Sequence, residues 1–409
     1  MSKHSILAVI GKGFGDEGKG LAVDHFCSRS ENTLVIKHNG GAQAGHTVEP
    51  EGKRFVFHQL SAGSFHSADT FWADSYYPDL YKLDEEMEEF CRLSGMRPKV
   101  ISDKDTHVTI IDDILINMII EKCRDDARHG SCGMGINECD LRTRAGYGIK
   151  VSDLLSSSAS EIIKRINDIR GDYGIRRLRE LGIASLVPTA PDLIELRDML
   201  GDPNVVRNHV EEMMRNAEKH VTICEDTGKE LRSREQLVFE NGQGLLLDSE
   251  NEEYAPHVTA SRTGLQNPCR ILKEHGLELN EAVYVTRSYV TRHGAGHLPY
   301  ECDMHDLGLS SEDETNVENP WQGRIRYARH GNREEFLKPV MKDLEENNTD
   351  GVKTSLFLTH LNVTDGMIRM EGGDEEVHEF ISEAKVKEVF DSFYLSDSRN
   401  GSPDKVKYY

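Results

Sequence analysis

Several features are missing from this 409-residue sequence, and each absence excludes a class of protein. The eight cysteines form no Cys-x-x-Cys pair, which argues against the usual zinc-binding spacing and against a disulfide framework. No apolar run approaches the roughly 18 residues that span a bilayer, and no signal-peptide pattern is present near the first residue. We therefore expect a reduced, cytoplasmic protein with no membrane partner.

Positive charge is also scarce, with 49 Lys and Arg against 71 Asp and Glu and a formal net charge of −22. Nucleic acids and anionic membranes are bound mainly by basic surfaces, so both are excluded as partners. A small basic pocket for a phosphorylated metabolite remains compatible with this charge. We expect one catalytic domain over residues 1–395, with a largely helical insertion at about 155–235 and an acidic loop at 301–320. Residues 396–409 are expected to form a polar tail.

Short apolar segments alternate with charged stretches of helical character. The stretches at 79–94 and 113–128 are typical of helices. A third helix is predicted from Ser158 to about Leu181, because Ser158 and Glu161 form a capping-box pattern. Alternation of this kind favours an α/β fold, with a mostly parallel central sheet and helices on both faces. The segments expected to form strands are 6–10, 34–38, 108–111, 237–240, 282–286 and 355–359.

The most informative segment is the run Gly-Phe-Gly-Asp-Glu-Gly-Lys-Gly at residues 13–20. It lies between an apolar run and a segment of helical spacing, the context in which backbone N–H groups and a helix N-terminus bind phosphate, as in P-loop NTPases. Gly20 stands where such a loop carries the Ser or Thr that holds magnesium, and the loop contains Asp16 instead. A carboxylate there would repel phosphate unless a metal bridges the two or the group acts as a base. The alternative is an ordinary tight turn between strand and helix.

A second glycine-rich loop, Asn39-Gly-Gly-Ala-Gln-Ala-Gly-His46-Thr47, follows the second predicted strand. Together with Gly15-Asp-Glu-Gly-Lys-Gly20, it resembles the adenylosuccinate synthetase family. The similarity covers most of the chain but is thin between about 155 and 235. The further segments that agree in order are 58–63, 129–136, 239–248, 256–259, 291–296, 323–326 and 359–362.

The resemblance implies a ligase that joins L-aspartate to C6 of a purine nucleoside monophosphate, driven by a nucleoside triphosphate. Because a 6-oxo group leaves poorly, the γ-phosphoryl group is first transferred to O6, which requires loss of the N1 proton. The amino group of aspartate then displaces phosphate. The resemblance further implies Mg²⁺ and a homodimer in which an arginine of one subunit reaches the nucleotide phosphate of the other. The local register leaves Arg142 and Arg144 equally eligible, and we assign Arg144.

The catalytic residues implied by the resemblance are Asp16, Lys19 and His46. Asp16 would take the N1 proton and ligate Mg²⁺, with the Gly45 carbonyl completing the metal shell. His46 would donate a hydrogen bond to the transferring phosphoryl group or to O6, and Lys19 would hold phosphate oxygens. The residues expected at the phosphates of the donor nucleotide are Gly15, Glu17, Gly18, Gly20 and Arg326. Those expected at the purine nucleotide are Asn39, Ser131, Cys132, Arg144, Gln243 and Thr259.

The base of the donor nucleotide is the first place where the chain departs from the family pattern. Asn362, within His360-Leu361-Asn362, replaces the aspartate that binds the two donors of guanine. An amide offers one acceptor and one donor, which fits the N6 amino group and N1 of adenine better. We therefore expect Asn362 to favour ATP as the donor, alone or alongside GTP. The alternative is that Asn362 is an ordinary loop residue and that guanine is bound elsewhere.

Two further departures concern the amino acid and the nucleotide phosphate. Trp321 and Gln322 replace paired threonines that help to hold the carboxylates of aspartate, so Arg324 is expected to bind these carboxylates with help from Gln322. Ser131 and Cys132 replace two threonines of the phosphate-binding loop, and a cysteine is a weak hydrogen-bond donor. Altered recognition of the nucleotide follows.

The sequence leaves alternatives open for the acceptor nucleotide and for the class of protein. Retention of Asp16 favours IMP or dIMP, because a phage relative that aminates a 2-amino purine nucleotide lacks this aspartate. GMP and dGMP stay open, as does a catalytically silent, nucleotide-binding sensor. A generic P-loop kinase or hydrolase is disfavoured by Gly20 and by the lack of a clear Walker-B aspartate, for which Asp248 is the only candidate and is interpreted as structural.

Overall fold

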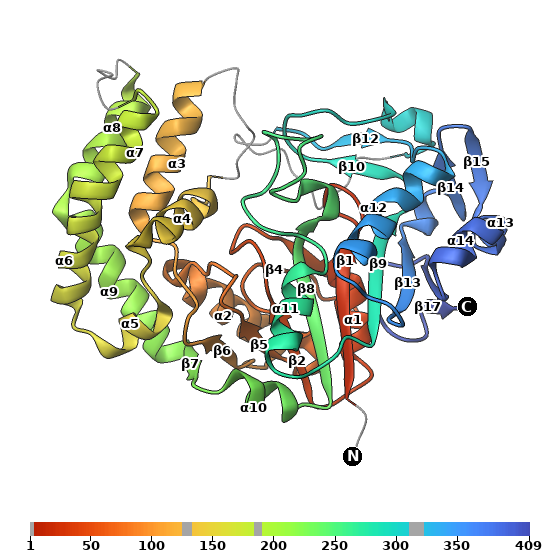
Figure 1. Cartoon of the computed structure of the whole chain (residues 1–409), viewed down its shortest axis with the longest axis horizontal. Coiled ribbons are helices and arrows are strands. Elements are labelled where there is room, and N and C mark those ends of the chain that lie inside the picture. The colour runs from red at the N-terminus through yellow and green to blue at the C-terminus, as the bar shows by residue number, and fades with distance from the viewer. Residues whose placement is uncertain (1–3, 125–132, 184–189, 311–322) are drawn as a thin grey trace.

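A sheet of ten strands runs through the centre of the computed structural model, which describes residues 4–124, 133–183, 190–310 and 323–409 (Figure 1). The strand order is β17-β16-β13-β9-β1-β8-β2-β5-β6-β7. β1 (Ser5–Gly11) lies between β8 (Gln236–Gly244) and β9 (Glu281–Arg287) and pairs in parallel with both. Its nearly continuous apolar sequence fits a strand that is covered on both faces.

The other strands extend the sheet on both sides of this centre, and all but the last pair in parallel. Beyond β8 follow β2 (Thr33–Lys37), β5 (Asp69–Trp72), β6 (Val100–Asp103) and β7 (Val221–Cys224). Beyond β9 follow β13 (Lys353–Thr359), β16 (Ser392–Ser396) and the antiparallel edge strand β17 (Val406–Tyr408). The predicted α/β class with a mostly parallel sheet is confirmed.

Helices cover both faces of the sheet because side chains alternate along each strand. Leu7 and Val9 of β1 join one buried core, and Ile6, Ala8 and Ile10 join the other. The first core is completed by α1 (Lys19–Cys27), α2 (Leu80–Ser94), α5 (Val151–Ser156), α6 (Ala159–Ile169) and α9 (Pro203–His220). The second is completed by α10 (Thr227–Arg232), α11 (Gln266–Glu274), α12 (Arg333–Glu346), α13 (Val377–Ser382) and α14 (Ala384–Val389).

The segment expected to be helical contains α6 to α10 and the strand β7, and its long helices lie at one side of the molecule beside α3 (Ile111–Arg124) (Figure 1). The predicted capping box starts α6, since Ser158 Oγ accepts from the Glu161 backbone N–H and the Glu161 carboxylate accepts from that of Ser158. A π-helical turn over Arg170–Gly174 separates α6 from α7 (Ile175–Glu180). The other helices of this side are α4 (Ile136–Arg142) and α8 (Pro191–Gly201).

Three small antiparallel sheets accompany the main one. One has the order β10-β12-β11, and the other two are hairpins. Their strands are β10 (Val290–Arg292), β11 (Glu301–Cys302) and β12 (Arg326–Ala328), then β3 (His46–Val48) with β4 (Phe55–Phe57), and β14 (Met367–Met370) with β15 (Gly373–Glu376). Of the expected acidic loop, the described part forms β11 and a 3₁₀ turn over Met304–Leu307, and residues 311–320 lie outside the described part.

Two sequence predictions differ from the structure. The predicted strand at 108–111 is wrong: the N–H of Val108 donates to Ile149 and that of Thr109 to Pro78, so the segment is a buried loop that leads into α3. The predicted polar tail also differs, because Val406–Tyr408 pairs with β16 and Gly401 is buried against α1, where its carbonyl is 2.9 Å from His25 Nδ1.

Within the part of the chain that the structure describes, no helix is both long and apolar enough to cross a lipid bilayer.

Candidate active site

The loop between β1 and α1 has the backbone conformation that its glycines predict. Gly15, Asp16 and Gly18 have φ values of 104°, 59° and 92°, in the left-handed region where glycine is favoured. A Cβ on Gly20 would lie 2.9 Å from the Thr47 carbonyl oxygen, so the Ser or Thr of an ordinary phosphate loop does not fit there. The glycine at this position is therefore a steric requirement of the neighbouring strand β3.

Glu17 stabilises this loop through the hydrogen bonds of its carboxylate. Its carboxylate accepts from the N–H groups of Gly13 (3.0 Å) and Gly15 (2.8 Å) and from Lys19 Nζ (2.7 Å). Its backbone carbonyl accepts from Thr359 Oγ1 at 2.7 Å. The sequence predicted Glu17 as a phosphate-binding residue, but its side chain points into the loop rather than toward the main cavity. Its contacts are those of a residue that fixes the loop conformation.

The main cavity, of about 330 Å³, opens at the carboxyl ends of the parallel strands. Loops that follow β1, β8, β9, β13 and β16 all contribute to it, the arrangement in which open α/β sheets bind their ligands. The predicted residues that line it are Gly15, Asp16, Gly18, Lys19, Gly20, Gly45, His46, Gln243 and Asn362. The fold thus brings together both glycine-rich loops and the residue expected at the donor base.

Asp16 is ionised and oriented by basic neighbours. His293 Nε2 lies 2.9 Å from Asp16 Oδ2, and Arg287 Nε donates to the Asp16 carbonyl. Burial alone would raise the pKa of the Asp16 carboxyl, but the hydrogen bond from His293 and the charges of Arg287 and Lys19 outweigh it and lower this pKa. An ionised carboxylate at the cavity wall suits both a base and a ligand for a hard cation.

His46 belongs to a buried group with Glu240 and Lys37. Its Nδ1 donates to Glu240 Oε1, and Lys37 Nζ lies 3.6 Å from the same oxygen. Burial would raise the pKa of Glu240, but Lys37 and His46 hold it at about 2, so Glu240 stays ionised. With Nδ1 committed to Glu240, the His46 Nε2 atom has no partner within the described residues. Burial lowers the pKa of His46 despite Glu240, which leaves a neutral ring in the free protein.

The predicted purine-binding residues are only partly brought together. Asn39 Nδ2 donates to Gln243 Oε1 at 3.3 Å, and Asn39 Oδ1 accepts from the Gly242 N–H at 2.8 Å. Gln243 Nε2 is buried without a partner among the described residues, so it can donate to a ligand in the cavity. Thr259 is held by its N–H to the Leu247 carbonyl, and neither it nor Asn39 lines the cavity. Ser131 and Cys132 lie outside the described residues.

The predicted arginines lie away from the main cavity. Arg326 Nη1 pairs with Glu301 at 2.8 Å, and Arg324 is exposed. Arg144 is exposed and pairs with Asp140, whereas Arg142 is buried and forms a bidentate pair with Asp113. Of the two arginines that the sequence left eligible, only Arg144 is therefore exposed at the surface of the chain. Gln322, like Trp321, lies outside the described residues.

Several residues that line the cavity were not predicted from the sequence as site residues. His293 and Arg287 contact Asp16, and Ser398 with Arg399 lines the far wall from the segment expected to be a tail. The sequence does indicate a role for Ser398 and Arg399. They belong to a polar run, Ser398-Arg-Asn-Gly401, that follows the buried strand β16, and other loops of the cavity also follow buried strands. His293 lies in the segment 291–296 that resembles the family, but nothing in the sequence marks it, or Arg287 at the end of β9, as a partner of Asp16.

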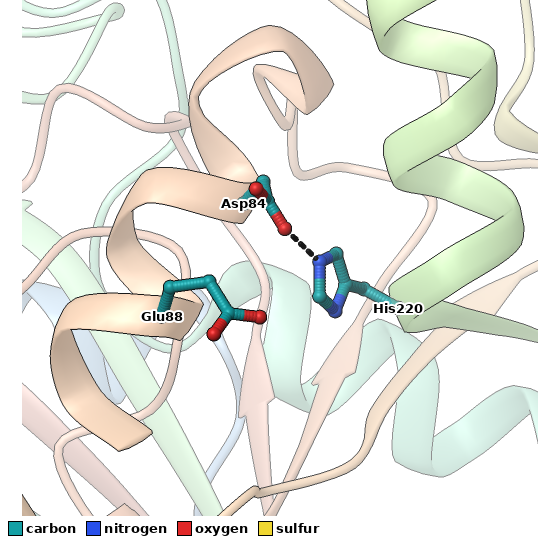
Figure 2. A group of neighbouring side chains, drawn as sticks. All are labelled: Asp84, Glu88 and His220. Atoms are coloured by element: carbon teal, nitrogen blue, oxygen red, sulfur yellow. Dashed lines mark hydrogen bonds and ion pairs between the residues drawn. The ribbon is translucent and has the colours of Figure 1, made fainter. Parts of the chain in front are cut away.

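One group of metal-ligating side chains lies outside this cavity, formed by Asp84, Glu88 and His220 (Figure 2). Asp84 Oδ1 accepts from His220 Nε2 at 2.7 Å. Lys219 Nζ lies 2.7 Å from Asp84 and 3.0 Å from Glu88, and Arg97 pairs with Glu88 at 2.8 Å. Two cations thus already neutralise both carboxylates, and the group is explained as an ion-pair network between α2 and α9.

Fold and site define an α/β protein in which a glycine-rich loop with an ionised carboxylate lines one cavity together with His46, whose ring is held by Glu240. The model of the adenylosuccinate synthetase family matches residues 8–370. The chain belongs to this family of C–N bond-forming ligases.

Individual relatives agree with this assignment. The adenylosuccinate synthetase of Thermus thermophilus is 29% identical over 415 residues, covering 98% of this chain and 86% of that protein. That of Chlorobium chlorochromatii is 27% identical over 298 residues, covering 72% of this chain but only 64% of the relative. This match therefore spans less than two thirds of the Chlorobium protein.

Two solved structures share the fold. A fully ligated adenylosuccinate synthetase from Plasmodium falciparum superposes with a TM-score of 0.68 at 15% identity, covering 98% of this chain and 99% of that one. The succinoaminodeoxyadenylate synthetase of cyanophage S-2L, bound to dGMP and to dATP as an energy donor, superposes with a TM-score of 0.59 at 15% identity. The coverage there is 99% of this chain and 95% of the phage protein.

Proposed function

We propose that this protein is a Mg²⁺- and nucleoside triphosphate-dependent ligase that joins L-aspartate to C6 of a purine nucleoside monophosphate, with IMP or dIMP as the acceptor. The observation that carries the proposal is the placement of Asp16, Lys19 and His46 around one cavity with Gln243. A phosphate-binding loop that also holds an ionised carboxylate suits a reaction that must remove a proton beside a phosphoryl group.

In the first step, Asp16 takes the N1 proton of the purine, so that O6 becomes the nucleophile. Lys19 and the loop N–H groups hold the phosphate oxygens while O6 bonds to the γ-phosphorus, the bond to the bridging oxygen breaks and the nucleoside diphosphate leaves. His46 becomes protonated at Nε2 as anionic phosphoryl oxygens approach, because Glu240 stabilises the imidazolium through Nδ1. It then donates to those oxygens. In the second step, the neutral amine of aspartate forms a bond to C6, the C6–O6 bond breaks and phosphate leaves, and the nitrogen releases one proton to solvent.

The residues present fit a magnesium ion. The Asp16 carboxylate, with its lowered pKa, and the Gly45 backbone line the same cavity, and both offer the oxygen ligands that Mg²⁺ prefers. When bound, the ion would neutralise charge on the transferring phosphoryl group.

We propose ATP as an accepted donor, alone or beside GTP. Asn362 is exposed at the rim of the cavity, and its amide offers both a donor and an acceptor. Support comes from the phage neighbour, which was solved with dATP as its energy donor. The same neighbour holds dGMP, which keeps a (d)GMP-dependent ligase as the second candidate.

Three arginines underlie our proposals for the binding of L-aspartate, for the approach to the triphosphate and for the oligomeric state. We propose that Arg324 binds the aspartate carboxylates with Gln322, and that Arg326 approaches the triphosphate once substrates are bound. We further propose a cytoplasmic homodimer in which Arg144 reaches the nucleotide phosphate of the partner subunit. The exposure of Arg144 supports this role.

The proposal is tested by phosphate release from the purified protein with Mg²⁺, over IMP, dIMP, GMP and dGMP against ATP and GTP, with and without L-aspartate. Release that requires both a purine monophosphate and aspartate, together with a succinyl adduct by mass, is the expected result. Release without aspartate would identify a hydrolase instead. Tight nucleotide binding with no adduct in any combination would identify a sensor.

A further inference from the structure

A second cavity, of about 480 Å³, lies behind the phosphate loop. Phe14, Gly15 and Arg287 contribute to both cavities, so a molecule in the second one would contact the reverse side of the loop. Its size is within the range of small-molecule sites. The proposed reaction places none of its substrates in this space.

Lys12 supplies the unusual chemistry of this cavity. The residue directly follows β1, is only 6% exposed and lines the cavity. Its ammonium nitrogen lies 3.8 Å from the centre of the Phe336 ring. Within the described residues it has no hydrogen-bond acceptor and no ion-pair partner. Burial lowers the pKa of Lys12 to about 7, while the charge of Glu17 raises it, so the amine is charged in part at neutral pH.

Three carboxylates on the cavity wall, those of Glu17, Glu250 and Glu335, already have partners of their own. Glu17 accepts from the loop and from Lys19, and Glu335 accepts from the Tyr300 hydroxyl and from the N–H of Asn332. Glu250 pairs with Arg262 at 2.9 Å. An unpaired buried cation is costly, and a ligand anion would remove that cost.

We propose that this cavity binds a small carboxylate-bearing molecule whose carboxylate pairs with Lys12. The ammonium of Lys12 carries one positive charge, which one carboxylate balances. The side walls formed by Phe14, Tyr254 and Phe336 are aromatic, which favours a ligand with an apolar or aromatic body. The site is independent of the proposed ligase reaction.

The probe for this site is benzoate, with the neutral isostere benzamide as its control. Calorimetric titration of the full-length protein is expected to detect benzoate and to find benzamide at least about tenfold weaker, as expected for loss of a charge-assisted hydrogen bond. Lys12→Met is expected to weaken benzoate by a similar factor. The matched control Lys338→Met, which removes an exposed cation at the same cavity, should leave benzoate binding unchanged.

A second readout uses the wild-type protein alone, in case Lys12→Met does not fold. A poorly protonated amine reacts readily with an acylating reagent, and mass mapping is expected to show that benzoate, but not benzamide, protects Lys12 from acylation. Equal binding of benzoate and benzamide, absence of benzoate binding, or acylation of Lys12 that benzoate leaves unchanged would overturn the proposal. Neither readout requires turnover, so the outcome is independent of the ligase assay.

Discussion

His293 and Asp16 form a close pair, with the imidazole Nε2 of His293 2.9 Å from Asp16 Oδ2. His293 follows β10 and Asp16 follows β1, so the contact exists only in the folded chain. It lowers the pKa of the carboxyl that faces the main cavity. The proposed base is therefore ionised before substrate arrives.

Asp16→Asn should abolish most of the ligase activity while leaving the phosphate loop intact. We expect kcat to fall by about a hundredfold to ten-thousandfold, the usual contribution of a general base. Nucleotide binding, measured by titration, should persist because Lys19 and the loop N–H groups remain. The matched control is Asp168→Asn, at an exposed position of α6, where activity should be unchanged. Full activity of Asp16→Asn would exclude Asp16 as the base.

His46→Ala should lower kcat by about a hundredfold to a thousandfold, as does removal of a donor that stabilises developing charge. KM for the purine monophosphate should change much less, because the interaction forms with the transferring group. His378→Ala, at an exposed position of α13, serves as the control in the same steady-state assay. A rise in KM with unchanged kcat would contradict the assigned role.

Asn362→Asp tests the donor nucleotide. A carboxylate accepts from both donors of guanine, so the ratio of kcat/KM for ATP to that for GTP should fall by about tenfold or more. Asn348→Asp makes the same chemical change at an exposed position after α12 and should leave the ratio constant. If the two variants behave alike, the donor base is bound elsewhere.

The two arginines at the end of α4 should separate stability from function. Arg142→Met leaves Asp113 buried and unpaired, so the free energy of unfolding should fall by about 3–5 kcal/mol. Arg144→Met removes only an exposed pair, worth about 1 kcal/mol or less. It should instead raise KM for the purine monophosphate if Arg144 reaches the partner's site. Denaturant titration and steady-state kinetics check both; an unchanged KM would remove Arg144 from the site.

The sequence predicted those elements whose signals are local. The central strands are continuous apolar runs, and the Ser158–Glu161 capping box starts α6 as expected. The apolar run at 108–111 was wrongly predicted as a strand. It is a buried loop whose N–H groups donate to the carbonyls of Pro78 and Ile149, and the spacing of apolar residues does not reveal these partners. The short strands β5 and β6 were not predicted because four residues carry little periodicity.

In the candidate site, too, the residues in local sequence patterns were predicted, and those defined by contacts in the folded chain were not. Glycine patterns predicted the phosphate loop and the loop that ends at His46. His293 acquires its role only because β10 lies beside the phosphate loop, where Arg292 forms a bridge with Phe14. Glu17 was assigned to phosphate from the motif, yet its side chain binds the loop itself. A tertiary contact therefore decides the role of His293, whereas hydrogen bonds within the loop decide that of Glu17.

Asp343 should make stability depend on pH. Burial raises the pKa of its carboxyl from 3.8 to about 7, although the Leu265 N–H and the Tyr284 hydroxyl donate to it. The folded chain thus binds a proton that the unfolded chain releases between about pH 4 and 7. Stability from this group is present below pH 4 and falls as pH rises to 7, by up to about 4 kcal/mol.

The comparison that isolates this effect is wild type against Asp343→Asn, with the free energy of unfolding measured from pH 5 to 8. The difference between the two proteins should shift with pH in favour of the variant as pH rises. A difference that is constant over this range would show that the folded carboxyl titrates near its ordinary value.

The most direct test of the account is the fate of the purine O6 atom. IMP labelled with ¹⁸O at C6 is incubated with the protein, Mg²⁺, ATP or GTP, and L-aspartate, and the phosphate and nucleotide products are weighed by mass spectrometry. The account predicts a succinyl adduct that has lost the label and inorganic phosphate that carries it. Unlabelled phosphate, or no adduct with either donor, would contradict the proposed ligase.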